Sequence, residues 1–229
     1  MAISIDTVYQ KVLALANKEQ RGYITPQEFN LLANQAQMEI FEQYFYDAKS
    51  EDGNLKNSTE FSNVDEILDE KISIFKTPAT LNVTSSFAIL PANMHRLGMV
   101  YTSDNVEVEQ LTEEEVLYLN QSPIAKPTKL FPAYIRTGQV SIRVYPPVAS
   151  GFVNCNYIRT PLNPKWGYII VAEQALYNNS NTVDFELHRS DEAELVYKIL
   201  SLAGIVIAKP GLGTYSDQQA TTQKTQEKQ

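Results

Sequence analysis

The sequence has 229 residues, with 27 acidic and 19 basic side chains, and its formal net charge is -8. A chain of this length can bury a substantial core, as one large domain or as two smaller ones. The single cysteine, Cys155, excludes an internal disulfide, and no stretch approaches the roughly 20 apolar residues that a membrane span requires. We therefore expect a protein made in a reducing cytoplasm, with no signal segment and no membrane contact.

Helical signals dominate residues 1–78. Apolar side chains at helical spacing predict a helix over 5–19, and Thr25-Pro26-Gln27-Glu28 has the pattern of a capping box with proline at the first helical position. A long helix is expected over 26–48, with an apolar stripe that is best explained as core. A turn is expected at 51–54, and a third helix over 64–75, where Lys71 stands within the apolar spacing.

From residue 79 onwards short runs of β-branched and aromatic residues, separated by prolines, indicate a sheet. The expected strands are 81–83, 87–90, 97–101, 106–108, 129–135, 140–144 and 153–158, with a further hairpin from 166–171 and 173–177. Thr137-Gly138 is the expected turn between two of these strands, and Thr112 is expected to open a short helix that ends near residue 120.

The last helix is expected to begin at Ser190 as N-cap and to end at Lys209-Pro210-Gly211, where proline cannot continue it. The sequence therefore predicts an α+β protein, a small helical bundle with an inserted antiparallel β domain and an extended C-terminal tail. The expected parts are a helical part (1–78), a β-rich insertion (79–186), a C-terminal helix that rejoins the bundle (187–210), and a flexible tail (211–229).

One strongly acidic band stands out against an otherwise neutral sequence. Ten acidic residues and only two basic ones, Lys49 and Lys56, lie between Glu39 and Glu70, and this imbalance equals the net charge of the whole chain. Such a field repels nucleic acids and anionic membranes. We expect the band to face solvent without basic partners in the same chain, and its leading members are Glu39, Glu42, Asp47, Glu51 and Asp52.

The sequence offers no constellation for catalysis, metal binding or cofactor binding. His95 and His188 lie far apart, and a calcium loop centred on Gly53 would have Ala48 and Thr59 where carboxylates are required. Cys155 lies within an expected strand and is explained as an interior residue. We therefore expect no enzyme activity, no metal and no cofactor.

Several short segments resemble the head-to-tail connector proteins of short-tailed bacteriophages, and most closely the ring or adaptor proteins of crAss-like phages. The segments are YQKVL (9–13), ANQAQMEIFE (33–42), LPANMHRL (90–97), YIRTP (157–161) and EAELV (192–196). The resemblance implies a helical bundle that carries a β domain, and a structural role in the virion neck. It also implies a closed ring of identical subunits that matches the twelve-fold symmetry of the portal, contacts the portal and other neck or tail proteins, and lets DNA pass without specific binding.

Two further expectations go with this reading. The acidic band would line the lumen of the ring, and the polar tail, with Tyr215, Gln218, Gln219 and Lys224, would dock on a neighbouring subunit or on the portal. The alternative is a peripheral virion module that binds glycans or proteins through the aromatic-rich β region. A hydrolase is less well supported, because neither a triad nor a carboxylate pair has suitable spacing.

Overall fold

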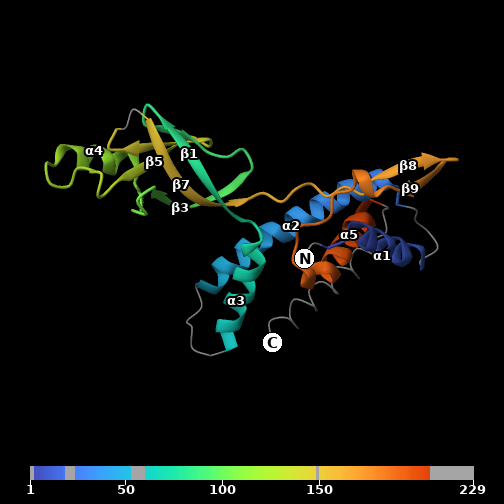
Figure 1. Ribbon diagram of the computed structural model, residues 1–229. Helices are drawn as coiled ribbons and strands as arrows, with labels where there is room; N and C mark the ends of the chain where they lie inside the picture. Colours follow the sequence, from blue (N-terminus) through green and yellow to red (C-terminus); the bar gives the residue numbers. More distant parts are fainter. Residues whose placement is uncertain (1–2, 19–23, 53–59, 148–149, 207–229) are drawn as a thin grey trace. The chain divides into compact units, whose positions relative to one another are not determined.

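The computed structural model describes residues 3–18, 24–52, 60–147 and 150–206. The chain forms two compact units, of which unit 1 comprises residues 1–74 and 161–229, and unit 2 comprises residues 75–160 (Figure 1). The predicted α+β class is confirmed, because N-terminal helices pack with the C-terminal helix, and the sequence between these helices forms a mostly antiparallel sheet. The expected boundaries of the β-rich part were 79–186, whereas the inserted compact unit spans 75–160.

The described residues of unit 1 contain four α-helices. They are α1 (Ile5–Lys18), α2 (Pro26–Asp52), α3 (Glu60–Ser73) and α5 (Glu192–Val206). Helix α5 packs against both α1 and α2, and α3 contacts α2. The apolar stripe of α2 is buried, with Phe29 and Phe41 fully inaccessible, as its helical spacing predicts.

The start of α2 confirms the predicted capping box. The Glu28 backbone N–H donates to Thr25 Oγ1 at 3.3 Å, and the Thr25 N–H donates to Glu28 Oε2 at 3.0 Å. The predicted end at residue 48 was wrong, because α2 continues to Asp52. Glu51 and Asp52 are compatible with a helix, and the first glycine after them is Gly53.

The predicted N-cap of the last helix was also wrong. A short 3-10 turn, η2 (Arg189–Asp191), precedes α5, and the His188 side chain caps this turn by accepting the Ser190 N–H. Ser190 therefore lies inside the turn, and its hydroxyl donates to Asp191 Oδ1 at 3.1 Å. A local cap pattern cannot distinguish a direct helix start from a preceding 3-10 turn.

Unit 2 contains one seven-stranded sheet with the order β3-β7-β1-β2-β6-β5-β4. Its strands are β1 (Lys76–Thr84), β2 (Phe87–Ile89), β3 (Met94–Thr102), β4 (Glu109–Gln110), β5 (Ala133–Thr137), β6 (Ser141–Tyr145) and β7 (Ser150–Arg159). All pairings are antiparallel except that of β4 with β5. The parallel pair arises because α4 (Glu113–Gln121) connects these two strands as a crossover. The predicted strand at 106–108 was wrong in position, since β4 begins at Glu109.

The sheet of unit 2 curls back on itself. Val108 N donates to the carbonyl of Val100 at 2.8 Å, and Tyr101 bridges Glu107, so the segment that leads into β4 also bonds to β3. Inward side chains from six strands fill the interior, among them Leu81, Val144 and Tyr157. Cys155 belongs to this core, and burial raises the pKa of its thiol, which keeps it protonated and unreactive.

The second predicted hairpin is present and belongs to unit 1. It consists of β8 (Tyr168–Val171) and β9 (Gln174–Tyr177), which pair only with each other. A 3-10 turn, η1 (Asn179–Asn181), follows it. Sequence analysis had grouped this hairpin with the β-rich insertion, because strand patterns give no information about which compact unit a hairpin joins.

Candidate functional site

The acidic residues of α2 differ in their surroundings. Glu42 is exposed, whereas Glu39 is half-buried and its carboxylate lies 2.7 Å from Lys198 Nζ on α5. The expectation that the band has no basic partner in the chain was therefore wrong for Glu39, because α5 brings a lysine against this face of α2. Asp47 is half-buried. The side chains of Glu51 and Asp52, and the expected turn residues that follow, lie outside the described part.

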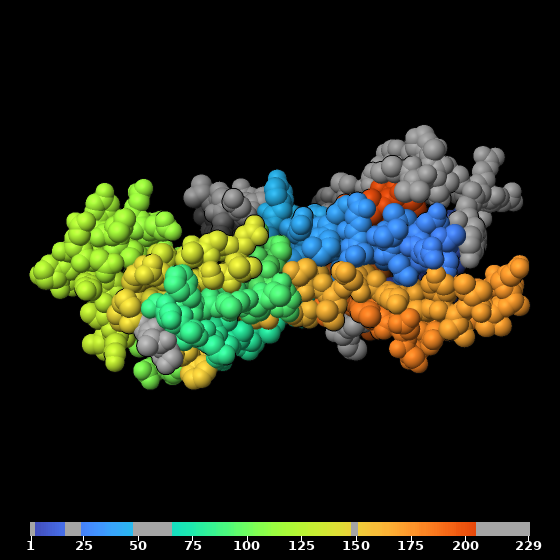
Figure 2. Space-filling model, turned by 90° about the horizontal axis from the view of Figure 1, so that it is seen from above, coloured from blue at the N-terminus to red at the C-terminus, as the bar shows by residue number. Residues whose placement is uncertain are grey.

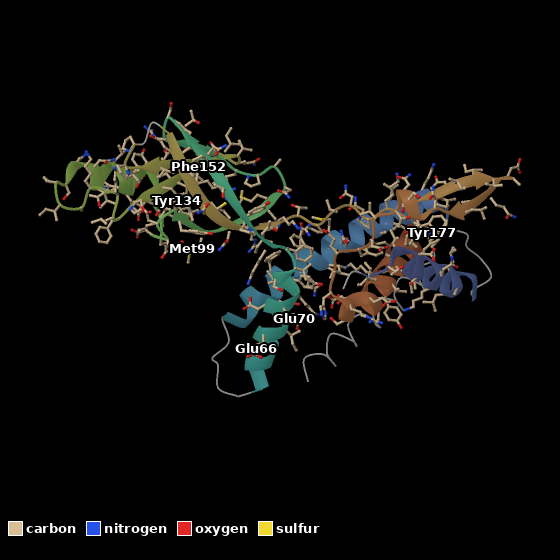
Figure 3. All side chains as sticks on the ribbon, in the orientation of Figure 1. Glu66, Glu70, Met99, Tyr134, Phe152 and Tyr177 are labelled. Carbon is tan, nitrogen blue, oxygen red and sulfur yellow. The ribbon has the colours of Figure 1, made fainter. Side chains whose placement is uncertain are left out.

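Helix α3 contributes the other described acidic side chains of the band. Glu66, Asp69 and Glu70 are exposed, and Glu66 and Glu70 lie one turn apart on α3 (Figure 3). Glu70 Oε1 is 4.0 Å from His188 Nε2. Because α3 contacts α2, Glu42 and these three carboxylates belong to the same helical unit. We refer to Glu42, Glu66, Asp69 and Glu70 as the acidic patch.

The Glu39–Lys198 pair gives a pH-dependent contribution to stability. Burial acts to raise the pKa of Glu39, but hydrogen bonds from Lys198 and Gln35 and the charge of Lys198 outweigh it, so the pKa is lowered. A lowered folded-state pKa stabilises the protein above the unfolded-state pKa of about 4.3, and this stabilisation is lost as the pH falls through the folded-state value.

We expect Glu39→Gln to lower the free energy of unfolding by about 0.2–1 kcal/mol at pH 7, since the pair is partly exposed to solvent. The difference from the wild type should be smaller at pH 3, because the carboxyl becomes increasingly protonated as the pH falls through its lowered folded-state pKa. Urea unfolding at both pH values measures this, and Glu42→Gln is the matched control on the exposed face of the same helix. An equal loss at both pH values would mean that packing, not charge, explains the effect.

A buried ionic network joins α2, α3 and η2. The Asp191 side chain is fully buried, Lys71 Nζ lies 2.6 Å from its Oδ1, and the Tyr44 hydroxyl donates to its Oδ2. The Lys71 ammonium also lies 5.8 Å from the centre of the Tyr44 ring. Because burial removes both charges almost completely from water, the hydrogen bonds within the network must stabilise these charges. The network fixes α2, α3 and η2 to one another, so its role is structural.

The network has a superficial likeness to a catalytic triad. His188, Ser190 and Asp191 are linked by hydrogen bonds, with His188 Nδ1 2.8 Å from Ser190 Oγ. In a triad the carboxylate holds the imidazole, but here the hydroxyl lies between them and the carboxylate pairs with Lys71. Across the described residues, no three His, Cys, Asp or Glu side chains are grouped so that they could hold a metal ion. His95 belongs to unit 2, and His188 belongs to unit 1.

Trp166 anchors the base of the β8–β9 hairpin on the helices. Asn30 of α2 accepts the Trp166 backbone N–H at 2.7 Å and donates to its carbonyl at 3.3 Å, and the indole N–H donates to Asp6 of α1 at 2.9 Å. The indole also packs against Tyr168 and Tyr177 at the start and end of the hairpin, with ring centroids 5.9 and 5.8 Å apart. The base of the hairpin is therefore fixed to unit 1.

The rest of the hairpin is apolar and uncovered. Ile170 is 72% exposed, and Ile169, Val171 and Leu176 are each about half exposed. The register places Ile170 on one face and the other three on the opposite face, so both faces present apolar side chains to solvent. The hairpin projects at the edge of unit 1, where its atoms are orange in Figure 2. An isolated two-stranded hairpin is only marginally stable in water, and exposed apolar surface of this kind is typical of interaction sites.

The turn of the hairpin has an unusual backbone. Ala172 and Glu173 have φ values of 50° and 65°, which is the left-handed conformation at both central positions. Glycine or asparagine normally occupies such a turn, and another residue costs roughly 1 kcal/mol or more at each position. Glu173 is the only charged residue between Tyr168 and Tyr177. The chain therefore holds a carboxylate at the tip at the expense of local strain.

A second uncovered apolar surface lies on the outside of the unit 2 sheet. Phe87, Ile89 and Phe152 are 42%, 76% and 63% exposed, and each alternates with residues that point into the core. The Arg143 guanidinium lies 5.4 Å from the centre of the Phe87 ring and 5.3 Å from that of Tyr145. Strands β1, β2, β6 and β7 contain no Asp or Glu. We refer to Phe87, Ile89, Arg143 and Phe152 as the outer face (Phe152 is labelled in Figure 3).

Sequence reasoning missed both apolar surfaces. Exposure depends on which side of a strand meets the core, and the alternation alone does not identify that side. One signal was present for the hairpin: β8 reads as four consecutive apolar residues, Tyr168–Val171, where a half-buried strand would alternate. The expected tail residues Tyr215, Gln218, Gln219 and Lys224 lie outside the described residues, as does the expected helix end at 209–211.

No model of a known protein family matches the sequence, and no curated protein is significantly similar to it. Every helix in the described ranges is too short or too polar to cross a membrane. Information on function therefore comes from the surfaces described above and from the short sequence segments that resemble phage connectors.

Proposed function

We propose that the protein is a structural component of the virion of a short-tailed bacteriophage, where it forms a ring in the neck between the portal and the tail. The observation that supports this best is the architecture together with the resembling segments. The helices of unit 1 carry an inserted β unit, as the resemblance implies, and the segments occur in both units. The protein is made in the cytoplasm of the bacterial host and incorporated into the virion.

Ring formation sets a requirement that this chain can meet. In a closed ring of identical subunits each chain offers two different surfaces, and contacts between them close by rotation. Units 1 and 2 each present an uncovered apolar surface. The acidic patch lines the lumen in this proposal, where its negative charge prevents DNA from adhering during passage.

Assembly is the direct test. We expect the purified protein to form a closed ring, either alone or after addition of the portal from the same phage. Light scattering gives the mass, and electron microscopy of negatively stained particles shows whether the ring is closed. A protein that remains monomeric under both conditions would exclude the ring proposal.

A peripheral virion module that binds glycans or proteins is the second candidate. The exposed Phe87 and Phe152 rings of unit 2 favour it, because exposed aromatic rings bind sugars and apolar protein surfaces. This candidate predicts a monomer that binds a saccharide array, and that Phe152→Ala abolishes this binding. Ring formation without saccharide binding would exclude it.

A further inference from the structure

The two uncovered apolar surfaces of the chain carry opposite charges. The β8–β9 hairpin is a narrow projection with apolar side chains on both faces and one carboxylate, Glu173, at its tip. The outer face is a broad sheet surface with exposed apolar side chains and one guanidinium, Arg143. An acidic tip on an apolar projection matches a basic centre in an apolar surface.

We propose that the β8–β9 hairpin of one copy docks on the outer face of unit 2 of the next copy, with Glu173 directed at Arg143. The inference rests on the proposed ring and names the contact that closes it. Each chain carries one hairpin and one outer face, so the contact is heterologous and can repeat around a ring. Two hairpins would bring two Glu173 carboxylates together, and two outer faces would bring two Arg143 guanidiniums together, so charge disfavours both like-with-like pairings.

The backbone of the hairpin supports this assignment. Ala172 and Glu173 hold left-handed conformations that Asn-Gly would adopt with less strain, so the chain retains a charged side chain at a position where stability alone favours glycine. Two backbone hydrogen bonds of Trp166 and one from its indole fix the base of the hairpin, which presents the apolar strands in one orientation. A pre-positioned hairpin loses little conformational freedom when it docks.

Substitutions on each surface test the proposal. Ile170→Glu on the hairpin and Phe152→Glu on the outer face should each weaken ring assembly at least about tenfold, because a buried carboxylate would replace an apolar contact. The matched control is Tyr46→Glu, since Tyr46 is 74% exposed on α2 and belongs to neither surface. Sedimentation velocity over a concentration series measures assembly, and circular dichroism verifies that each variant is folded.

Cross-linking provides an independent readout that needs no loss of assembly. Gln174→Cys lies near the hairpin tip and Asn82→Cys lies beside Phe152 on the sheet, where Asn82 and Phe152 are paired. With a short bismaleimide, a mixture of the two single variants, one of them enlarged by a tag, should give a dimer of mixed mass. Cys155 is buried and should not react. Each variant alone should give little dimer.

The possible outcomes distinguish a failure of the proposed hairpin contact from a failure of the proposed ring. If Ile170→Glu assembles as well as the wild type, the hairpin contact is excluded and the ring stands. Dimers from Gln174→Cys alone would show that two hairpins pair with each other. In a variant that carries both Gln174→Cys and Asn82→Cys, a cross-link within one chain would show that the hairpin docks on its own chain. Either result overturns the proposal. A wild-type protein that does not assemble with or without portal excludes both the ring and this contact.

Discussion

Replacing Lys71 with methionine should lower the free energy of unfolding by about 3–5 kcal/mol, because it leaves the buried Asp191 carboxylate without its ionic partner. The Asp191 side chain is 0% exposed and its Oδ1 lies 2.6 Å from Lys71 Nζ. Methionine has a similar length and can occupy the space of the lysine stem, so the loss reports mainly on the unpaired charge. Tyr44→Phe removes one hydrogen bond to the same carboxylate and should cost about 1–3 kcal/mol.

Urea unfolding followed by tryptophan fluorescence measures this effect. Trp166 is the only tryptophan and lies in unit 1 with the network, so its signal reports on the affected unit. The control is the double variant Lys71→Met with Asp191→Asn, which removes both charges and should recover a large part of the loss. If Lys71→Met costs less than about 1 kcal/mol, the pair behaves like an exposed salt bridge and the burial argument is wrong.

Reversing the charge of the acidic patch should make an assembled ring bind DNA. The variant Glu42→Lys, Glu66→Lys and Glu70→Lys replaces three exposed carboxylates with ammonium groups. We expect roughly 10- to 100-fold tighter nonspecific binding at low salt. The plot of the logarithm of the binding constant against the logarithm of the salt concentration should become steeper by about 0.9 for each phosphate contacted. The matched control replaces Glu109, Glu113 and Glu114 of unit 2 with lysine. These residues are also exposed, and their replacement changes the net charge by the same amount.

Linear and circular DNA distinguish an acidic patch in the lumen of the ring from one on its outer surface. A preassembled ring with cationic residues in its lumen should bind linear duplex DNA, which can enter by an end, and should not bind a closed circular plasmid. Cationic residues on the outside should bind both forms alike, as we expect for the control. A patch variant that also binds both forms alike would place these residues outside the lumen. A variant that unfolds would show that the carboxylates stabilise the helices.

Local signals predicted much of the fold. The capping box at Thr25 depends on residues three positions apart and is present as predicted. Thr112 opens a short helix as predicted, and it does so through a second capping box. The buried stripe of α2 follows from helical periodicity alone. The Thr137-Gly138 turn likewise joins β5 to β6, with Gly138 at a φ of 70°.

Features that join distant parts of the chain were not predictable in this way. Lys71 and Asp191 are 120 residues apart, and Glu39 and Lys198 pair only because α5 packs on α2. Lys71 did give a signal, since it stands at a core position in the apolar spacing of α3, and a buried lysine requires an anionic partner. The partner itself could not be identified, because many acidic residues were available and the packing of the helices selects among them.

The pairing of β1 with β7 bears on how this protein can change over evolution. The chain enters unit 2 at Phe75 and leaves it after Thr160. The Arg159 N–H, one residue before this exit, donates to the Phe75 carbonyl at 3.0 Å. Neighbouring paired residues lie only about 5 Å apart. A short turn therefore suffices to close the helical unit if the sheet is deleted, and a different sheet can be inserted at the same place without rerouting the helices. Related lineages can thus exchange the inserted unit as one genetic block and keep the helical framework.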